Sequence, residues 1–142
     1  MKILYRATAH VEQGRNGRAR SDDGALEVDL SVPESLGGAG GTGTNPEQLF
    51  AAGYGACFLG AVMVAAQRKR VELTEQDLTA EVSVGIGPQK GGAYNLEVEL
   101  KVGLAGVEPE LAREIVELAH ETCPYSNATR GNVDVTLGLI DA

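Results

Sequence analysis

The chain has 142 residues, of which 43% are hydrophobic and 23% are charged, and its formal net charge is −8. This length predicts a single domain over residues 1–142 with a hydrophobic core of its own. The acidic balance argues against a nucleic-acid-binding protein, which needs a concentrated basic surface. Residues 1–13 show no signal-peptide pattern and we expect no membrane-spanning segment, so the protein is expected in the cytoplasm.

Hydrophobic periodicity and turn residues predict the order of elements along the chain. Strands are expected over residues 3–13, 19–32, 78–86, 93–104 and 132–140, and helices over residues 46–69 and 108–122. Asn45 as N-cap with Pro46 in the first turn is the simplest start for the first helix, and a capping box of Thr44 and Glu47 is the alternative. This order predicts an α+β domain with mainly antiparallel sheet, a long central helix and a second helix.

Two motifs that suggest a bound group have weak support. Residues 38–43 match G-x-G-x-x-G, but a dinucleotide site also needs a βαβ unit and an acidic residue further along the chain. His120 and Cys123 have H-x-x-C spacing, whereas a structural zinc needs four ligands. We therefore expect no cofactor and no metal, and interpret His120 as a cation favoured at a helix C-terminus.

The first helix carries Gly53 and Gly55 close to Cys57, although each glycine costs about 0.5–1 kcal/mol relative to alanine in a helix. Cys57 could be a small core residue, since free cysteine is often buried. Alternatively, the small residues let a substrate approach its sulfur. Cys123 precedes Pro124 at a helix exit, where we expect a mobile segment. A fixed thiol and a mobile one suit a cycle in which a sulfenic acid condenses with a second thiol.

A reactive Cys57 needs a cation to ionise it, because free cysteine is mostly protonated at neutral pH. The cluster Arg15, Arg18 and Arg20 is the best source, and Glu47 could hold one of these arginines. Ten helical residues separate Glu47 from Cys57, about 15 Å. A helix kink, a long arginine side chain or a second subunit could bridge that distance. The run of alanine and glycine over residues 51–61 favours close helix packing, and hence a homodimer with the site near its interface.

Four segments closely resemble the organic hydroperoxide resistance (Ohr) branch of the Ohr/OsmC superfamily, over nearly the whole chain. They read GRNG, LGGAGGTGTNPEQLF, NPEQLFAAGYGACF and CPYSNATRGNVDV. The resemblance implies the OsmC/Ohr-like fold, an intertwined homodimer, and a cofactor-free thiol peroxidase that reduces organic and lipid hydroperoxides to alcohols. It also implies dihydrolipoamide or a lipoylated protein as the reductant.

On the matching positions, the resemblance implies that Cys57 attacks the peroxide and that Cys123 resolves the sulfenic acid. It likewise implies that Arg15 activates the thiol and that Glu47 holds Arg15. Asn16 stands where the family often has Asp. From their positions alone, four residues are expected to line an alkyl pocket: Leu36, Phe50, Phe58 and Tyr125. A core role is the alternative for Phe50 and Phe58.

Two other functions fit the residues. The protein could be a dithiol–disulfide oxidoreductase, although the absence of C-x-x-C counts against it. It could also be a non-catalytic dimer that binds an apolar ligand and uses both cysteines for packing.

Overall fold

The computed structural model describes residues 1–140 and divides into two compact units, the second of which begins at Phe50. The first unit contains a three-stranded antiparallel sheet in the order β1-β2-β3. Its elements are β1 (Ala9–Glu12), η1 (Gly14–Asn16), β2 (Arg18–Ser21), β3 (Glu27–Asp29) and η2 (Glu34–Leu36). The first turn of α1 (Pro46–Arg68) also belongs to it.

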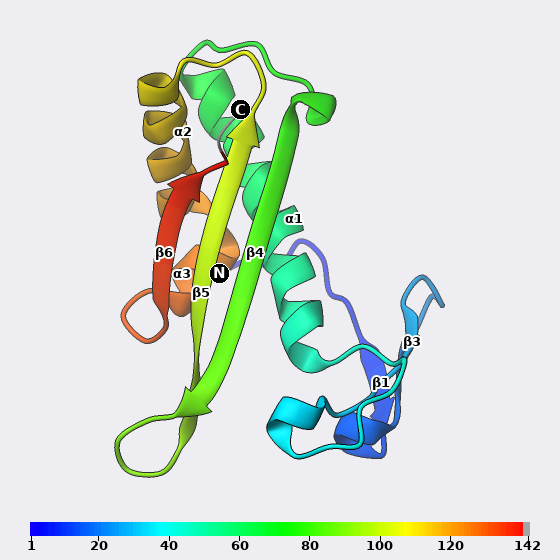
Figure 1. Ribbon diagram of the computed structural model, residues 1–142. Helices are drawn as coiled ribbons and strands as arrows, with labels where there is room; N and C mark the ends of the chain where they lie inside the picture. The colour runs from blue at the N-terminus through cyan, green and yellow to red at the C-terminus, as the bar shows by residue number, and fades with distance from the viewer. Residues whose placement is uncertain (141–142) are drawn as a thin grey trace. The chain divides into compact units, whose positions relative to one another are not determined.

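The second unit contains the rest of α1 and a three-stranded sheet in the order β4-β5-β6 (Figure 1). Its other elements are η3 (Glu75–Asp77), β4 (Leu78–Pro88), β5 (Tyr94–Leu104), α2 (Pro109–Thr122), α3 (Pro124–Thr129) and β6 (Asp134–Leu139). β4 and β5 form an antiparallel hairpin, whereas β6 runs parallel to β5. The predicted α+β class with mainly antiparallel pairing is confirmed, and the parallel β6 is the exception.

The core of the second unit lies between this sheet and the helices that cover one of its faces. Alternate residues of β5 point inward, and Leu100 and Val102 are fully buried. They belong to one apolar cluster with Phe58 of α1 and Ile115 of α2. Burial of large aliphatic and aromatic side chains supplies about 1.5–3 kcal/mol each, so this cluster stabilises the position of α1 on the sheet.

Helix α1 begins with Asn45 as its N-cap, so the simpler of the two predicted starts is confirmed. The Asn45 Oδ1 atom accepts a hydrogen bond from the Gln48 N–H at 2.8 Å, while the Glu47 carboxylate is used elsewhere. The expectation of no segment long and apolar enough to span a membrane is wrong, because an 18-residue window of α1 has a mean hydropathy of 1.9. This hydropathy reflects the length and composition of the helix alone. The core of the second unit buries three of its side chains, Tyr54, Phe58 and Val62.

Three local features differ from the sequence prediction. The strand expected over residues 19–32 is interrupted by a turn in which Ser21 Oγ donates to Asp23 Oδ1 at 2.6 Å and accepts from the Leu26 N–H at 2.9 Å. Serine and aspartate side chains that bond to the nearby backbone favour turns over continuous strands. The first strand covers only residues 9–12 of the expected 3–13, and the short helix α3 was not predicted.

Candidate active site

The two cysteine sulfurs lie next to one another, although 66 positions separate them in the sequence. Cys123 Sγ is 3.8 Å from Cys57 Sγ, and both thiols are free. Cys57 lies on α1, and Cys123 lies between the end of α2 and the start of α3. A disulfide needs about 2.05 Å between sulfurs, so a small displacement would join this pair.

Cys123 lies within the core, and its mobility stays a prediction. Cys123 is 0% exposed and belongs to the core cluster, whereas Cys57 is partly exposed. The Cys123 N–H donates to Ala119 O at 2.8 Å, and its own carbonyl accepts from the Asn127 N–H at 2.9 Å. Cys123 therefore ends one helix and begins the next, and both of its backbone polar groups are bonded.

The glycines of α1 permit close packing by the protein itself. A methyl group added at Gly55 would lie 3.1 Å from Val82 of β4, and one at Gly53 would lie 3.4 Å from the Tyr125 hydroxyl. A side chain at Gly55 would require Val82 to shift by a few tenths of an ångström, whereas one at Gly53 would make ordinary contact with Tyr125. The two glycines thus bring α1 close to the elements on either side of Cys57. Gly55 also lines a groove between α1 and β4.

Within the second unit, the environment of Cys57 favours the neutral thiol. Burial raises the pKa of Cys57, and the neighbouring Cys123 thiol raises it further. A hydrogen bond from the Tyr125 backbone N–H acts in the opposite direction and lowers it. Because burial is the largest of these effects, the pKa of Cys57 lies above that of an ordinary thiol, and a nearby cation would act in the opposite direction.

The first unit contains a guanidinium–carboxylate pair of the kind such a role requires. Arg15 Nη1 donates to Glu47 Oε2 at 3.0 Å, and Nη2 donates to Glu47 Oε1 at 2.8 Å. The paired hydrogen bonds lower the pKa of Glu47 and raise the pKa of Arg15, so both groups stay charged. The Glu47 side chain is 13% exposed and that of Arg15 is 40% exposed, so part of the guanidinium remains accessible.

The other two arginines of the predicted cluster do not bond to Glu47. Arg18 pairs with Glu27 at 3.1 Å and with Asp29 at 2.9 Å on the exposed face of its sheet, and Arg20 is exposed on the same strand. Arg15 lies in η1, which begins directly after Gln13. Gln13 adopts the left-handed conformation at φ 59°. A non-glycine residue in that conformation carries backbone strain, a feature that clusters at functional sites.

His120 does not behave as the expected helix-terminal cation. Burial is the main effect that lowers the pKa of His120, and the nearby Arg130 lowers it further. Its Nδ1 atom is hydrogen-bonded to Ser126 Oγ at 2.8 Å. His120 and Cys123 therefore have separate partners, since the Cys123 thiol faces Cys57.

Two of the four residues expected to line an alkyl pocket lie near one another. Phe58 takes the alternative core role, because it is fully buried. Phe50 and Tyr125 lie together in the second unit with ring centroids 6.3 Å apart, and Tyr125 is 41% exposed. Leu36 lies in the first unit. The Tyr125 N–H that bonds to Cys57 was not expected from the sequence. Tyr125 lies in the first turn of α3, and Pro124 directly after Cys123 could have signalled that helix start.

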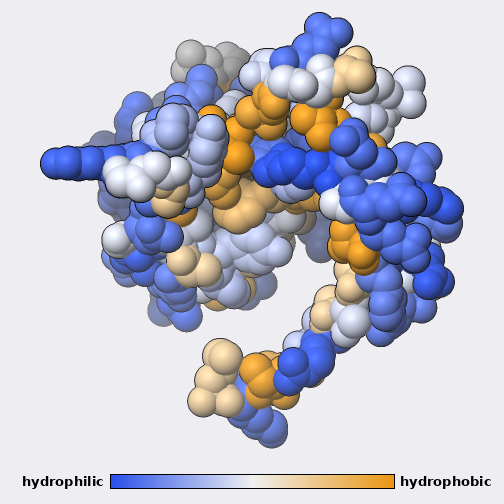
Figure 2. Space-filling view, turned by 90° about the horizontal axis from the view of Figure 1, so that it is seen from below, coloured by the Kyte–Doolittle hydropathy of each residue, from blue (hydrophilic) through white to orange (hydrophobic). Residues whose placement is uncertain are grey.

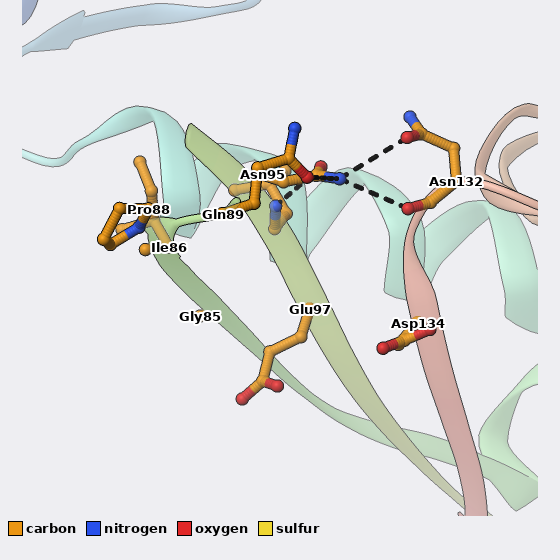
Figure 3. A pocket seen from close by; sticks show the side chains of 10 residues that line it. Gly85, Ile86, Pro88, Gln89, Asn95, Glu97, Asn132 and Asp134 are labelled. Carbon is orange, nitrogen blue, oxygen red and sulfur yellow. Dashed lines mark hydrogen bonds between the residues drawn. The ribbon is translucent and has the colours of Figure 1, made fainter. Parts of the chain in front are cut away.

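A hollow lies away from the cysteines, at the turn end of the β4–β5 hairpin (Figure 3). Its volume is about 440 Å³, and its lining includes Asn95, Glu97, Asn132 and Asp134. Asn95 Nδ2 donates to Asn132 O at 3.2 Å, which joins the hairpin to the segment before β6. Among the described residues, the lining of this hollow contains no thiol, histidine or arginine, so the cysteine pair stays the candidate active site.

The chain is similar to several known proteins. Residues 38–138 match the model of the family described as OsmC-like protein. The organic hydroperoxide resistance protein of Xanthomonas axonopodis pv. citri is 51% identical over 138 residues, which are 97% of this chain and 96% of that protein. The crystal structure of OhrB from Bacillus subtilis has a TM-score of 0.88 at 45% identity, with 97% of this chain and all of that chain covered. An organic hydroperoxide resistance protein from Elizabethkingia anophelis has a TM-score of 0.91 at 44% identity, with full coverage of both chains.

The chain therefore belongs to the OsmC-like family. The similar proteins named above are organic hydroperoxide resistance proteins, so the resemblance to the Ohr branch is confirmed. The predicted OsmC/Ohr-like fold is confirmed by the same high TM-scores.

Proposed function

We propose that this protein is a cysteine-based peroxidase that reduces organic and lipid hydroperoxides to alcohols and so confers resistance to them. The observation that carries the proposal is the 3.8 Å separation of the Cys57 and Cys123 sulfurs. Its relatives support the substrate class, because their names specify organic hydroperoxides.

The proposed cycle has three steps. The Cys57 thiolate attacks the terminal oxygen of ROOH, the O–O bond breaks, and the released alkoxide takes a proton to give ROH. Cys57 is left as a sulfenic acid, which the Cys123 thiol attacks to form the disulfide and expel water. A dithiol such as dihydrolipoamide, free or attached to a protein, then reduces the disulfide by exchange and becomes a cyclic disulfide itself.

In this proposal Arg15 supplies the positive charge that the Cys57 environment lacks. Burial disfavours the Cys57 thiolate, and the Arg15 guanidinium offsets this effect by stabilising the anion and the charge that develops on the peroxide. Glu47 fixes the orientation of Arg15 through two parallel hydrogen bonds. Arg15 and Glu47 could serve Cys57 of the same subunit or of its partner.

We also propose that the protein works as a homodimer in the cytoplasm. Ala52, Ala56 and Gly60 recur every fourth residue along α1 and are all exposed in the single chain. Ala56 also lines an apolar groove of about 260 Å³ between α1 and β4. Hydrophobic surface is visible on the face drawn in Figure 2, and four apolar residues near the N-terminus are at least 50% exposed: Met1, Ile3, Leu4 and Tyr5. A second copy would cover such surfaces.

The test compares the wild type with Cys57→Ser and Cys123→Ser in single-turnover reactions with tert-butyl hydroperoxide, followed by mass spectrometry and by alcohol release. We expect no alcohol from Cys57→Ser. Cys123→Ser should release one equivalent as Cys57 becomes a sulfenic acid, and a second equivalent as excess hydroperoxide oxidises it to sulfinic acid. Wild-type turnover should need dihydrolipoamide. If both variants consume the hydroperoxide as the wild type does, the peroxidase proposal is wrong. Disulfide exchange without peroxide consumption would favour an oxidoreductase of protein disulfides.

A further inference from the structure

A buried network of hydroxyl groups lies beside Cys123. Ser126 is 0% exposed, and its Oγ atom is 2.9 Å from the Tyr54 hydroxyl and 2.8 Å from His120 Nδ1. Tyr54 is also fully buried, and its hydroxyl lies 3.4 Å from Thr129 Oγ1. Among residues 1–140, every buried side-chain nitrogen or oxygen has a hydrogen-bond partner.

The network connects the three helices that surround the two sulfurs. Tyr54 lies on α1 one turn before Cys57, while His120 and Ser126 lie three residues before and three residues after Cys123. Arg130 adds a second connection over the same junction: its guanidinium donates to His120 O at 2.5 Å and to Asn127 Oδ1 at 2.7 Å. The chain is therefore bonded on both sides of Cys123.

This arrangement limits how Cys123 can move. Cys123 provides no side-chain cap for α3, so apart from its two backbone hydrogen bonds the junction depends on neighbouring side chains. A fully satisfied polar network specifies one geometry more strictly than apolar packing does, because a shift would leave buried groups unpaired. Since burial keeps His120 largely neutral near pH 7, its bond to Ser126 does not depend on a charge.

We propose that Tyr54, His120 and Ser126 are positioning residues that hold Cys123 against Cys57, so that disulfide formation outruns oxidation of the sulfenic acid by a second hydroperoxide. The inference rests on the proposed peroxidase function and concerns its second step. A sulfenic acid that meets no thiol goes on to sulfinic acid, which simple thiols do not reverse. The Cys123 sulfur must close from 3.8 Å to bonding distance before that happens.

The test uses Tyr54→Phe, Ser126→Ala and His120→Leu, with His120→Asn as the conservative variant whose amide can still bond to Ser126. Thr122→Val is the matched control, because its hydroxyl bonds only to Leu118 O and Ala119 O in the last turn of α2. Stopped-flow measurements follow oxidation of Cys57 by tert-butyl hydroperoxide and, separately, disulfide formation. Mass spectrometry measures the fraction of Cys57 sulfinic acid as the hydroperoxide concentration rises.

We expect disulfide formation to slow by between about 10-fold and about 100-fold in the three network variants, as misplacement of a reacting group by about 1 Å does. Sulfinic acid should then accumulate at lower hydroperoxide concentrations, while the oxidation rate of Cys57 changes far less. His120→Asn and Thr122→Val should behave like the wild type. If Ser126→Ala does not fold, Tyr54→Phe and the comparison of His120→Leu with His120→Asn decide the question.

The outcomes separate the inference from the proposed function. Failure of wild-type Cys57 to react with the hydroperoxide would overturn the peroxidase proposal. Normal Cys57 oxidation with unchanged disulfide rates and sulfinic acid yields in all network variants would overturn the positioning role alone. A loss of disulfide rate that His120→Asn does not restore would show that packing, rather than the hydrogen bond to Ser126, fixes Cys123.

Discussion

Substitutions of two buried hydroxyls should have unequal effects on stability, although both remove one oxygen atom. Ser126→Ala leaves His120 Nδ1 without its partner and leaves the Tyr54 hydroxyl with Thr129 alone at 3.4 Å. Tyr54→Phe removes a hydroxyl whose partners keep other bonds: Ser126 still bonds to His120, and Thr129 still donates to Tyr125 O at 3.0 Å. An orphaned buried polar group costs about 1–3 kcal/mol, and a lost hydrogen bond with satisfied partners costs about 0.5–1.5 kcal/mol.

We therefore expect Ser126→Ala to lower the free energy of unfolding by about 1 kcal/mol more than Tyr54→Phe does. Urea unfolding of the reduced proteins at one fixed protein concentration measures the difference, with equal m-values as the condition for the comparison. In the double variant the two effects should be less than additive, because both act on the same hydroxyl pair. The reasoning is refuted if Tyr54→Phe costs as much as Ser126→Ala or more.

Three further predictions concern the charged pair and the assembly. Arg15→Gln should slow Cys57 oxidation by about 10-fold to about 100-fold in stopped-flow measurements, the effect of losing a cation that lowers the pKa of the thiol by about one to two units. Arg18→Gln should react as the wild type does, because Arg18 pairs with Glu27 and Asp29. Because Arg15 lowers the pKa of Glu47, the stability that the Glu47 carboxylate contributes is full above its ordinary pKa of about 4.3 and is lost as the pH falls through its lowered pKa. The unfolding free energies of the wild type and Glu47→Gln should thus differ at neutral pH and converge in acid; a constant gap contradicts the pairing. Ala56→Arg should convert a dimer into a monomer by sedimentation, while Gln67→Arg, near the exposed end of α1, should leave the dimer intact.

The fold could be predicted largely from local patterns, and the exceptions have local causes. Alternation along residues 93–104 and the Asn45–Pro46 start of α1 both survive in the structure because nothing in the surrounding packing opposes them. The strand expected over residues 19–32 failed because the Ser21 and Asp23 side chains bond to the chain nearby and close a turn. The parallel pairing of β5 and β6 depends on where α2 packs, which periodicity within a strand does not reveal.

The candidate site shows a similar division. The types of its residues could be chosen from the sequence, and the structure brings together Arg15 with Glu47 and Cys57 with Cys123. The placement of Cys123 in the core was missed because Pro124 does not end the helical region but begins α3. The role of Gly53 and Gly55 depends on Tyr125 and Val82, which approach α1 from distant parts of the chain.

The unequal exposure of the two sulfurs also decides how an oxidised protein can be reduced. Cys123 is completely covered by its neighbours, while Cys57 is in part open to solvent. In the proposed cycle, an incoming thiolate would therefore attack the Cys57–Cys123 disulfide at the Cys57 sulfur, and Cys123 would leave into the interior. Release of a monothiol from Cys57 would need a second thiol molecule, whereas a dithiol carries both sulfurs, in keeping with the dithiol reductant proposed above.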